Sequence, residues 1–304
     1  MTSAPRDLSP PSSPGRGAPL RALRTYLEMI KIEHTVFALP FAFLGMMLAA
    51  EGWPPWPVVG WIVAAMVGAR SAAMGFNRLV DRTIDAKNPR TARRALPAGL
   101  LGAGAVRVFI AASLALLVVA AWRLSPLALA LSPVAIAIVL LYSYTKRFTA
   151  ASHLVLGLGL AGAPLGAWIA VRGEVAPAAF VLALVVATWV AGFDVLYALQ
   201  DERFDREHGL HSIPVRFGVR GALVLSATLH AVMLGALAVL PLLYRGRLGA
   251  GYTVGLGGCV ALLVYQHWVV RPRDLSRLDA AFFQANGALA LWLFAATAFD
   301  ILRP

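Results

Sequence analysis

Charged residues and cysteine are both scarce in this 304-residue chain, and each scarcity excludes a class of protein. Charged residues make up 14% of the sequence and hydrophobic residues 59%, whereas a soluble domain carries roughly 25% charged residues. The single cysteine, Cys259, lies inside an apolar run, so an intrachain disulfide is excluded and a buried structural thiol is expected. The sequence therefore predicts a polytopic membrane protein without redox chemistry.

Acidic residues are also few, with 15 Asp and Glu against 27 Lys and Arg. A basic excess can indicate nucleic-acid binding, but here the basic residues fall in short segments between apolar runs. Membrane insertion and anionic lipid already account for that placement. We therefore predict a lipid bilayer and not nucleic acid as the partner of these charges.

The first twenty residues are rich in Pro and Ser and hold no apolar segment like that of a signal peptide. We expect residues 1–24 to form a disordered cytoplasmic tail, followed over residues 25–304 by one all-α domain with nine transmembrane helices. Each span needs about 20 apolar residues to cross the bilayer. The nine predicted spans are 35–51, 57–76, 104–122, 126–144, 152–171, 177–197, 221–243, 249–270 and 280–302.

The placement of basic residues also predicts orientation in a bacterial-type inner membrane. Most Lys and Arg fall in the tail and after the second, fourth, sixth and eighth spans. Basic residues concentrate on the cytoplasmic side of membrane proteins, so the N-terminus should be cytoplasmic and the C-terminus outside. The opposite side holds only Arg123, Arg172, Arg245, Arg247 and Arg303.

An acidic motif follows the second predicted span, where residues 77–85 read NRLVDRTID. Asn77, Asp81 and Asp85 recur every four residues, which places them within roughly 80 degrees of one helix face. Ordinary surface ion pairs, Arg78 with Asp81 and Arg82 with Asp85, are an alternative explanation of this stretch alone.

A second acidic stretch ends the sixth predicted span, where residues 194–205 read DVLYALQDERFD. Asp194, Tyr197, Asp201 and Asp205 again project onto an arc of roughly 80 degrees if the helix continues. The positions of Tyr197, Asp201 and Asp205 repeat those of Asn77, Asp81 and Asp85 at an offset of 120 residues. The offset is a weak indication of an internal repeat.

Both acidic stretches should lie on the same side of the membrane, where their carboxylates need neutralising. Oxygen ligands without His or Cys partners suit Mg²⁺, which binds one or two carboxylates and takes its other ligands from water and substrate phosphate. A diphosphate is then the expected third component. A cation-coupled transporter is an alternative from another class, because intramembrane carboxylates also line ion paths.

Basic residues near these stretches are candidate ligands for substrate anions. Arg70 lies seven residues before Asn77 and about 10 Å deeper on the same face, where it could anchor a carboxylate or a diphosphate. Arg94 follows the first acidic stretch, and Lys146 and Arg147 end the fourth predicted span. Membrane topology alone could also explain these last residues.

With these residues in place, the chain resembles the UbiA superfamily of intramembrane aromatic prenyltransferases over roughly residues 25–302. NRLVDRTID matches the family's Asn-x3-Asp-x3-Asp motif, DVLYALQDERFD matches its second acidic region, and TARRALPAG and YSYTKR match its loop segments. The paired Asp-Asp run of soluble isoprenyl diphosphate synthases is absent. The resemblance implies an all-α fold of nine transmembrane helices around a central cavity that is capped on the cytoplasmic side, with two Mg²⁺ ions bridging a prenyl diphosphate.

Residue roles follow from that resemblance as expectations. Five carboxylates are the expected catalytic residues: Asp81, Asp85, Asp194, Asp201 and Asp205. The expected metal ligands are Asn77, Asp81, Asp85, Asp201 and Asp205. The expected substrate-binding residues are Arg70, Asn77, Arg94, Lys146, Arg147 and Tyr197.

The implied reaction joins a polyprenyl diphosphate to an aromatic acid. Stabilising the departing diphosphate lets the allylic carbon–oxygen bond ionise, and the electron-rich ring then attacks the carbocation. Asp194 is a candidate to steer the phenol or accept its proton. The acceptor is 4-hydroxybenzoate, as in ubiquinone biosynthesis, or alternatively a dihydroxynaphthoate on the way to menaquinone.

Overall fold

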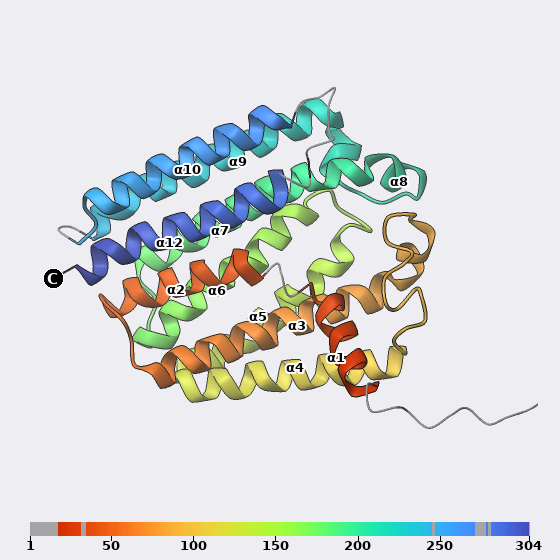
Figure 1. Ribbon diagram of the computed structural model, residues 1–304, viewed down its shortest axis with the longest axis horizontal. Helices are drawn as coiled ribbons and strands as arrows, with labels where there is room; N and C mark the ends of the chain where they lie inside the picture. The colour runs from red at the N-terminus through yellow and green to blue at the C-terminus, as the bar shows by residue number, and fades with distance from the viewer. Residues whose placement is uncertain (1–17, 32–34, 245–246, 271–277, 279–280, 304) are drawn as a thin grey trace, which may run out of the picture.

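The computed structural model describes residues 18–31, 35–244, 247–270, 278 and 281–303. Residues 1–17 of the predicted tail lie outside these ranges. The same holds for Arg245 and for the arginines at positions 271, 273 and 277. Every secondary-structure element among the described residues is helical (Figure 1). The prediction of an all-α protein is therefore confirmed.

Most of the helices are joined by a few residues, whereas residues 88–102 form a longer connection between α3 and α4. Their bounds are α1 Ala18–Met29, α2 Thr35–Ala50, α3 Trp56–Lys87, α4 Ala103–Leu124, α5 Pro126–Thr145, α6 Ser152–Arg172, α7 Pro177–Ala198, η2 Leu199–Asp201, α8 Glu202–Glu207, α9 Ile213–Leu243, α10 Ala250–Val269, η3 Ala281–Ala285 and α12 Asn286–Leu302. The helix α1 begins at Ala18, inside the range predicted as tail.

Each of the nine predicted spans corresponds to a helix whose ends lie within a few residues of the prediction, except that α3 and α9 are longer. Within the described residues, seven helical segments are long and apolar enough to cross a membrane. By length and hydropathy, the predicted count of nine spans is therefore slightly too high. Helix α2, for example, has 16 residues, fewer than the roughly 20 that a full crossing needs.

Local signals in the sequence set several helix ends. Ser125 and Ser212 cap α5 and α9, where their hydroxyl oxygens accept hydrogen bonds from the N–H groups of Ala128 and Val215 at 3.1 and 3.4 Å. Gly173 ends α6 in the left-handed region, with φ of 69°, a conformation that costs glycine little. These caps satisfy backbone groups that would otherwise lack partners at the helix termini.

The helices pack as two groups that share α6. One group is a closed ring in which α2, α6, α7, α9, α10 and α12 contact one another in turn, and the other joins α3, α4 and α5 to α6. The interior of the ring is a continuous apolar core that includes Phe41, Trp189 and Leu237. Cys259 is fully buried in this core, which confirms the predicted structural thiol.

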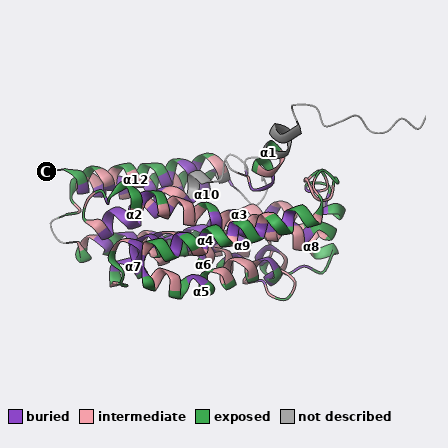
Figure 2. Ribbon diagram, turned by 90° about the horizontal axis from the view of Figure 1, so that it is seen from below, coloured by how far each residue is buried: buried purple, intermediate pink, exposed green. Residues whose placement is uncertain are grey.

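The outer surface of the bundle carries many large apolar side chains. Val108 on α4, Val134 on α5 and Val264 on α10 are each more than half exposed, and exposed positions alternate with buried ones along the outer helices (Figure 2). A water-soluble surface would not expose apolar side chains over such an area. The protein is therefore an integral membrane protein.

Helix α3 is longer than a membrane crossing requires. Its 32 residues span about 48 Å at 1.5 Å per residue, whereas the hydrocarbon core is about 30 Å thick. The last three turns, which carry Asn77, Asp81 and Asp85, therefore extend beyond an apolar segment of ordinary length. The length of this helix places the first acidic motif at the end of the bundle opposite the C-terminus (Figure 1).

Close approach of α6 to α7 depends on one glycine. A Cβ atom at Gly157 would lie 2.2 Å from the backbone oxygen of Ala187, whereas a Cβ at Gly162 on the same helix would meet no atom within 4 Å. The backbone of α7 cannot move away as a flexible side chain can. Gly157 thus sets the spacing between the two helices, as small residues do in membrane bundles.

We expect Gly157→Ala to lower the free energy of unfolding by about 1–3 kcal/mol, the usual cost of overpacking. Gly162→Ala is the matched control on α6 and should be neutral or stabilising by about 0.5–1 kcal/mol, because alanine is the better helix former. Thermal unfolding of the purified variants in detergent measures both changes. Equal melting temperatures for the two variants would contradict the role assigned to Gly157.

Candidate active site

The first acidic motif lies on the last turns of α3, as its four-residue spacing predicts. Asp81 and Asp85 are almost completely buried, with 1% and 4% of their surface exposed. The side-chain N–H of Asn77 donates to Asp81 Oδ2 at 3.0 Å. Two buried carboxylates one turn apart require counter-charges.

Asp81 receives its counter-charges from the end of α5. Lys146 Nζ lies 2.5 Å from Asp81 Oδ2, and Arg147 Nη2 lies 3.1 Å from Asp81 Oδ1. The alternative expectation of local surface ion pairs differs from this arrangement. Arg78 donates to Asn77 Oδ1 at 3.3 Å, and Arg82, on the exposed side of α3, donates to the backbone oxygen of Leu79.

Asp85 is paired with a residue of the loop that follows α3. Arg94 Nη1 donates to both carboxylate oxygens, at 2.8 and 2.9 Å. The Thr91 hydroxyl donates to the backbone oxygen of Asp85 at 3.0 Å. The segment 88–102 therefore folds back over the end of α3, which places the predicted substrate ligand Arg94 beside the first motif.

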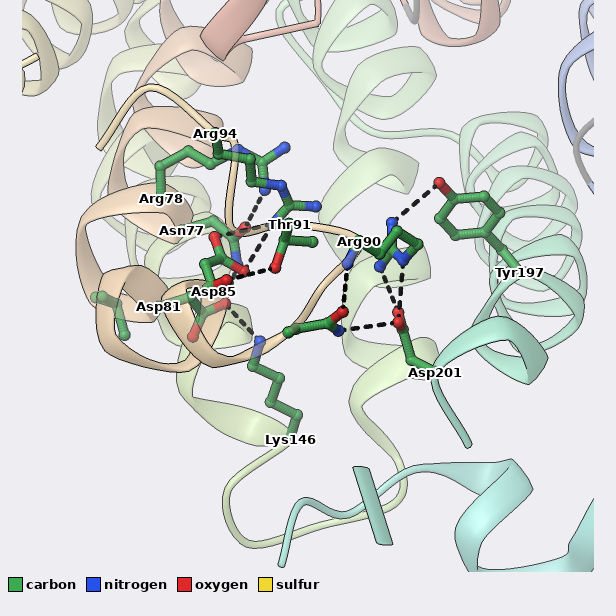
Figure 3. A network of polar contacts seen from close by, with 12 residues as sticks. Asn77, Arg78, Asp81, Asp85, Arg90, Thr91, Arg94, Lys146, Tyr197 and Asp201 are labelled. Carbon is green, nitrogen blue, oxygen red and sulfur yellow. Dashed lines mark hydrogen bonds and ion pairs between the residues drawn. The ribbon is translucent and has the colours of Figure 1, made fainter. Parts of the chain in front are cut away.

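The same loop also reaches the second acidic stretch (Figure 3). Arg90 donates to both oxygens of Asp201, with Nε at 3.0 Å from Oδ1, and Asn88 Nδ2 donates to Oδ1 at 3.1 Å. The Arg90 guanidinium also lies over the Tyr197 ring, 5.5 Å from its centroid. Asp201 and Tyr197 are thus joined to the first motif through one loop.

The charge of Arg90 is fixed by this pairing. Burial of its guanidinium acts to lower the pKa of Arg90, but the hydrogen bond and negative charge of Asp201 outweigh burial, so the pKa lies above the usual arginine value. Arg90 therefore remains a cation at any physiological pH. A permanent cation beside Asp201 can turn toward an anionic substrate when one enters.

The second acidic stretch does not form one continuous α-helix, which corrects the projection made from its spacing. The chain tightens into a 3₁₀ turn over Leu199–Asp201 before α8 begins. Asp205, on α8, lies close enough to Asp201 and Ser212 to interact with both electrostatically. The backbone N–H of His211 donates to the backbone oxygen of Lys146 at 2.7 Å, which brings this segment against the end of α5.

Asp194 and Arg70 have hydrogen-bond partners other than the residues labelled in Figure 3. His153 Nδ1, at the start of α6, lies 2.7 Å from Asp194 Oδ2. Arg70 Nη2 donates to the backbone oxygen of Lys31 at 3.0 Å, just beyond the end of α1. His153 and the backbone of Lys31 are thus the partners that orient these two predicted site residues.

Comparison with known proteins identifies the chain. A family model described as the UbiA prenyltransferase family matches residues 38–295. The chain belongs to this family. It is 30% identical to the 4-hydroxybenzoate octaprenyltransferase of Vibrio cholerae (strain ATCC 39315) over 270 residues, which cover 86% of this chain and 93% of that protein. The Aliivibrio salmonicida protein of the same name is 30% identical over 79% of this chain and 84% of its own length.

Solved structures support the same assignment. A UbiA homolog from Aeropyrum pernix K1 in its apo form is 33% identical, with a TM-score of 0.81 over 89% of this chain and 99% of that chain. A UbiA homolog from Archaeoglobus fulgidus bound to DMAPP and Mg²⁺ is 19% identical, with a TM-score of 0.72 over 91% and 99% of the two chains. At that lower identity the likeness concerns the fold. The protein is a membrane prenyltransferase of the UbiA family.

The donor atoms of this UbiA site fit a hard divalent cation. Within the described part of the chain, no three carboxylate, His or Cys side chains converge closely enough to hold a metal by themselves. Mg²⁺ does not need such a cage, because one or two carboxylates suffice when water and phosphate oxygens supply the rest. Asp81, Asp85 and Asp201 meet that need, and their present partners are cations that a diphosphate could attract away.

Sequence reasoning missed several residues of the site. Asn88, Arg90 and Thr91 hold the loop against both acidic stretches, and His153 holds Asp194. Asn88 and Arg90 directly follow the first motif, which is a local signal for them. Their partner Asp201 lies more than a hundred residues away in sequence, so no local pattern could indicate the contact.

Proposed function

We propose that this UbiA protein transfers a polyprenyl group from polyprenyl diphosphate to the ring of an aromatic acid, with 4-hydroxybenzoate as the acceptor and Mg²⁺ as the cofactor. The names of relatives at 30% identity support this acceptor. The observation that carries the proposal is that Asp81, Asp85 and Asp201 are each paired with a basic side chain, and that one loop, through Asn88, Arg90, Thr91 and Arg94, contacts both acidic stretches.

The charges of that network suit a diphosphate together with a divalent cation. Each basic residue pairs with a carboxylate, and each is 24–33% exposed, so its charged group can reach an entering substrate. Asn77, Asp81, Asp85, Asp201 and Asp205 would hold the cation. When bound, Mg²⁺ supplies positive charge that stabilises the departing diphosphate.

The side chains of this protein perform the remaining steps in the proposal. Arg94, Lys146 and Arg147 turn from the carboxylates to the phosphate oxygens and orient the allylic carbon–oxygen bond. Tyr197 lies beside Arg90 and limits the room around the diphosphate. Arg70 is proposed to bind the acceptor carboxylate and Asp194 its phenol. The apolar bundle excludes water, which would otherwise quench the carbocation.

The membrane orientation belongs to the proposal as well. The basic loops and the site lie at one end of the bundle and the C-terminus at the other (Figure 1). The charge bias then favours a cytoplasmic site in an inner membrane. A reporter fused to the C-terminus that proved cytoplasmic would contradict this orientation.

An acceptor panel tests the function directly. We expect purified protein with Mg²⁺ and a polyprenyl diphosphate to release diphosphate and give a product whose mass equals 4-hydroxybenzoate plus the prenyl group. A dihydroxynaphthoate is the second acceptor of the panel, and its exclusive use would replace 4-hydroxybenzoate in the proposal. Absence of product with every aromatic acid would contradict the proposal.

A further inference from the structure

Asp194 is held differently from Asp81, Asp85 and Asp201. Those three carboxylates are each paired with lysine or arginine. The partner of Asp194 is His153, whose Nδ1 lies 2.7 Å from Asp194 Oδ2. Among the described residues the other oxygen, Oδ1, has no hydrogen-bond partner, and the side chain is 24% exposed. One oxygen of Asp194 is therefore fixed and the other is available to a ligand.

The second contact of His153 indicates which ring nitrogen is the donor. The backbone N–H of Ile213, in the first turn of α9, donates to His153 Nε2 at 3.4 Å. Because Nε2 accepts this hydrogen bond, the proton that is shared with Asp194 lies on Nδ1. His153 Nδ1 is therefore the donor to Asp194 Oδ2.

His153 also joins three helices at this point. It is 5% exposed and stands in the first turn of α6, Asp194 is on α7, and Ile213 begins α9. A buried imidazole fixed at both nitrogens has little freedom to rotate. The geometry therefore fixes the plane of the Asp194 carboxylate as well as its position.

We propose that His153 is a positioning residue that holds Asp194 Oδ1 toward the phenol of the aromatic acceptor. This inference rests on the proposed function, which places the acceptor beside Asp194. With Oδ2 held by His153 Nδ1, Asp194 Oδ1 can accept a hydrogen bond from the phenol O–H.

The bonds and protons of the prenyl transfer balance when Asp194 holds this position. The ring carbon forms a bond to the allylic carbon, whose bond to oxygen breaks, and diphosphate leaves with the electron pair. The phenol proton passes to Asp194 as the ring donates its electrons. The hydrogen on the substituted ring carbon then leaves as a proton, and Asp194 returns its own proton to the phenol oxygen. The net products are the prenylated acid, diphosphate and one proton.

Two substitutions at His153 separate positioning from packing. His153→Asn places an amide N–H near the position of Nδ1 and keeps the donor to Asp194. His153→Leu has similar bulk and no donor. We expect His153→Leu to lower kcat by about 10- to 100-fold, the scale of a misplaced catalytic group, with the KM for the prenyl diphosphate changed by less than about 2-fold. His153→Asn should recover most of that loss.

A double-mutant cycle completes the test. If His153 acts through Asp194, the single variant Asp194→Asn and the double variant that also carries His153→Leu should have equal rates. The reason is that His153→Leu has no further effect once the Asp194 carboxylate is gone. Multiplied losses in the double variant, or equal kcat for His153→Leu and wild type, would overturn the inference. So would a loss in His153→Asn as large as in His153→Leu. Thermal unfolding in detergent shows that each variant is folded.

The same assay distinguishes this inference from the function on which it rests. Wild type that forms no prenylated product with any aromatic acid would refute the proposed function and the role of His153 together. Wild type that forms product while His153→Leu does so at the same rate would refute the role of His153 alone.

Discussion

Asp81→Asn is expected to lower kcat/KM for prenyl transfer by about 10³-fold or more while the protein remains folded. Asp81 is the most buried carboxylate of the site, at 1% exposed, and it contacts Asn77, Lys146 and Arg147. An amide lacks the negative charge that holds a divalent cation and orders these basic residues. Losing electrostatic stabilisation of a departing anion typically costs 10²–10³ in rate, and a weakened metal site adds to that loss.

The fold should tolerate the Asp81 substitution because the released cations are not trapped. The side chains of Lys146 and Arg147 are each 30% exposed, so both can reach water, and the amide keeps the shape of the carboxylate. Asp201→Asn should have a comparable effect on activity, since Asp201 is the matching carboxylate of the second stretch. Product formation under saturating and limiting prenyl diphosphate separates kcat from KM.

Glu207→Gln is the matched control for both aspartate variants. Glu207 stands on α8 in the same acidic stretch, but it pairs with Arg203 on the surface, where the two side chains are 53% and 90% exposed. Such a pair contributes little, so activity should stay within about 2-fold of wild type. Near-normal activity in Asp81→Asn and Asp201→Asn would instead assign these carboxylates to structural ion pairs.

Removal of Mg²⁺ is expected to abolish prenyl transfer completely and reversibly. The four basic residues of the site already neutralise its carboxylates in this structure. A diphosphate that attracts those cations leaves Asp81, Asp85 and Asp201 uncompensated in a buried site, which is unfavourable. The divalent cation removes that repulsion, so cation and diphosphate should bind together. Chelation should stop product formation, and added Mg²⁺ should restore it.

A binding measurement tests the same coupling without turnover. We expect a non-reacting prenyl diphosphate analogue to raise the melting temperature of the protein only when Mg²⁺ is present, because ligands that bind the native state stabilise it. Asp201→Asn should require more Mg²⁺ for the same shift. Full activity after chelation would contradict the proposal. Solute uptake into proteoliposomes without a prenyl donor, and independent of Mg²⁺, would favour a cation-coupled transporter.

The two acidic stretches show what the spacing of residues along the chain can and cannot predict. The four-residue spacing of Asn77, Asp81 and Asp85 correctly placed them on one helix, because an uninterrupted α-helix carries such a spacing onto one face. The same reasoning failed for the second stretch, where the 3₁₀ turn at Leu199–Asp201 changes the rotation per residue. Nothing in the local composition marked that turn.

Hydropathy, spacing and motifs predicted the membrane class, the positions of most helices and the family, and they marked the carboxylates that are proposed for the site. Those properties depend on residues close together along the chain. The partner of each carboxylate became visible only in the folded protein. Arg90 meets Asp201 and His153 meets Asp194 because a loop and three helices converge, and the packing of distant segments leaves no signal in a short stretch of residues.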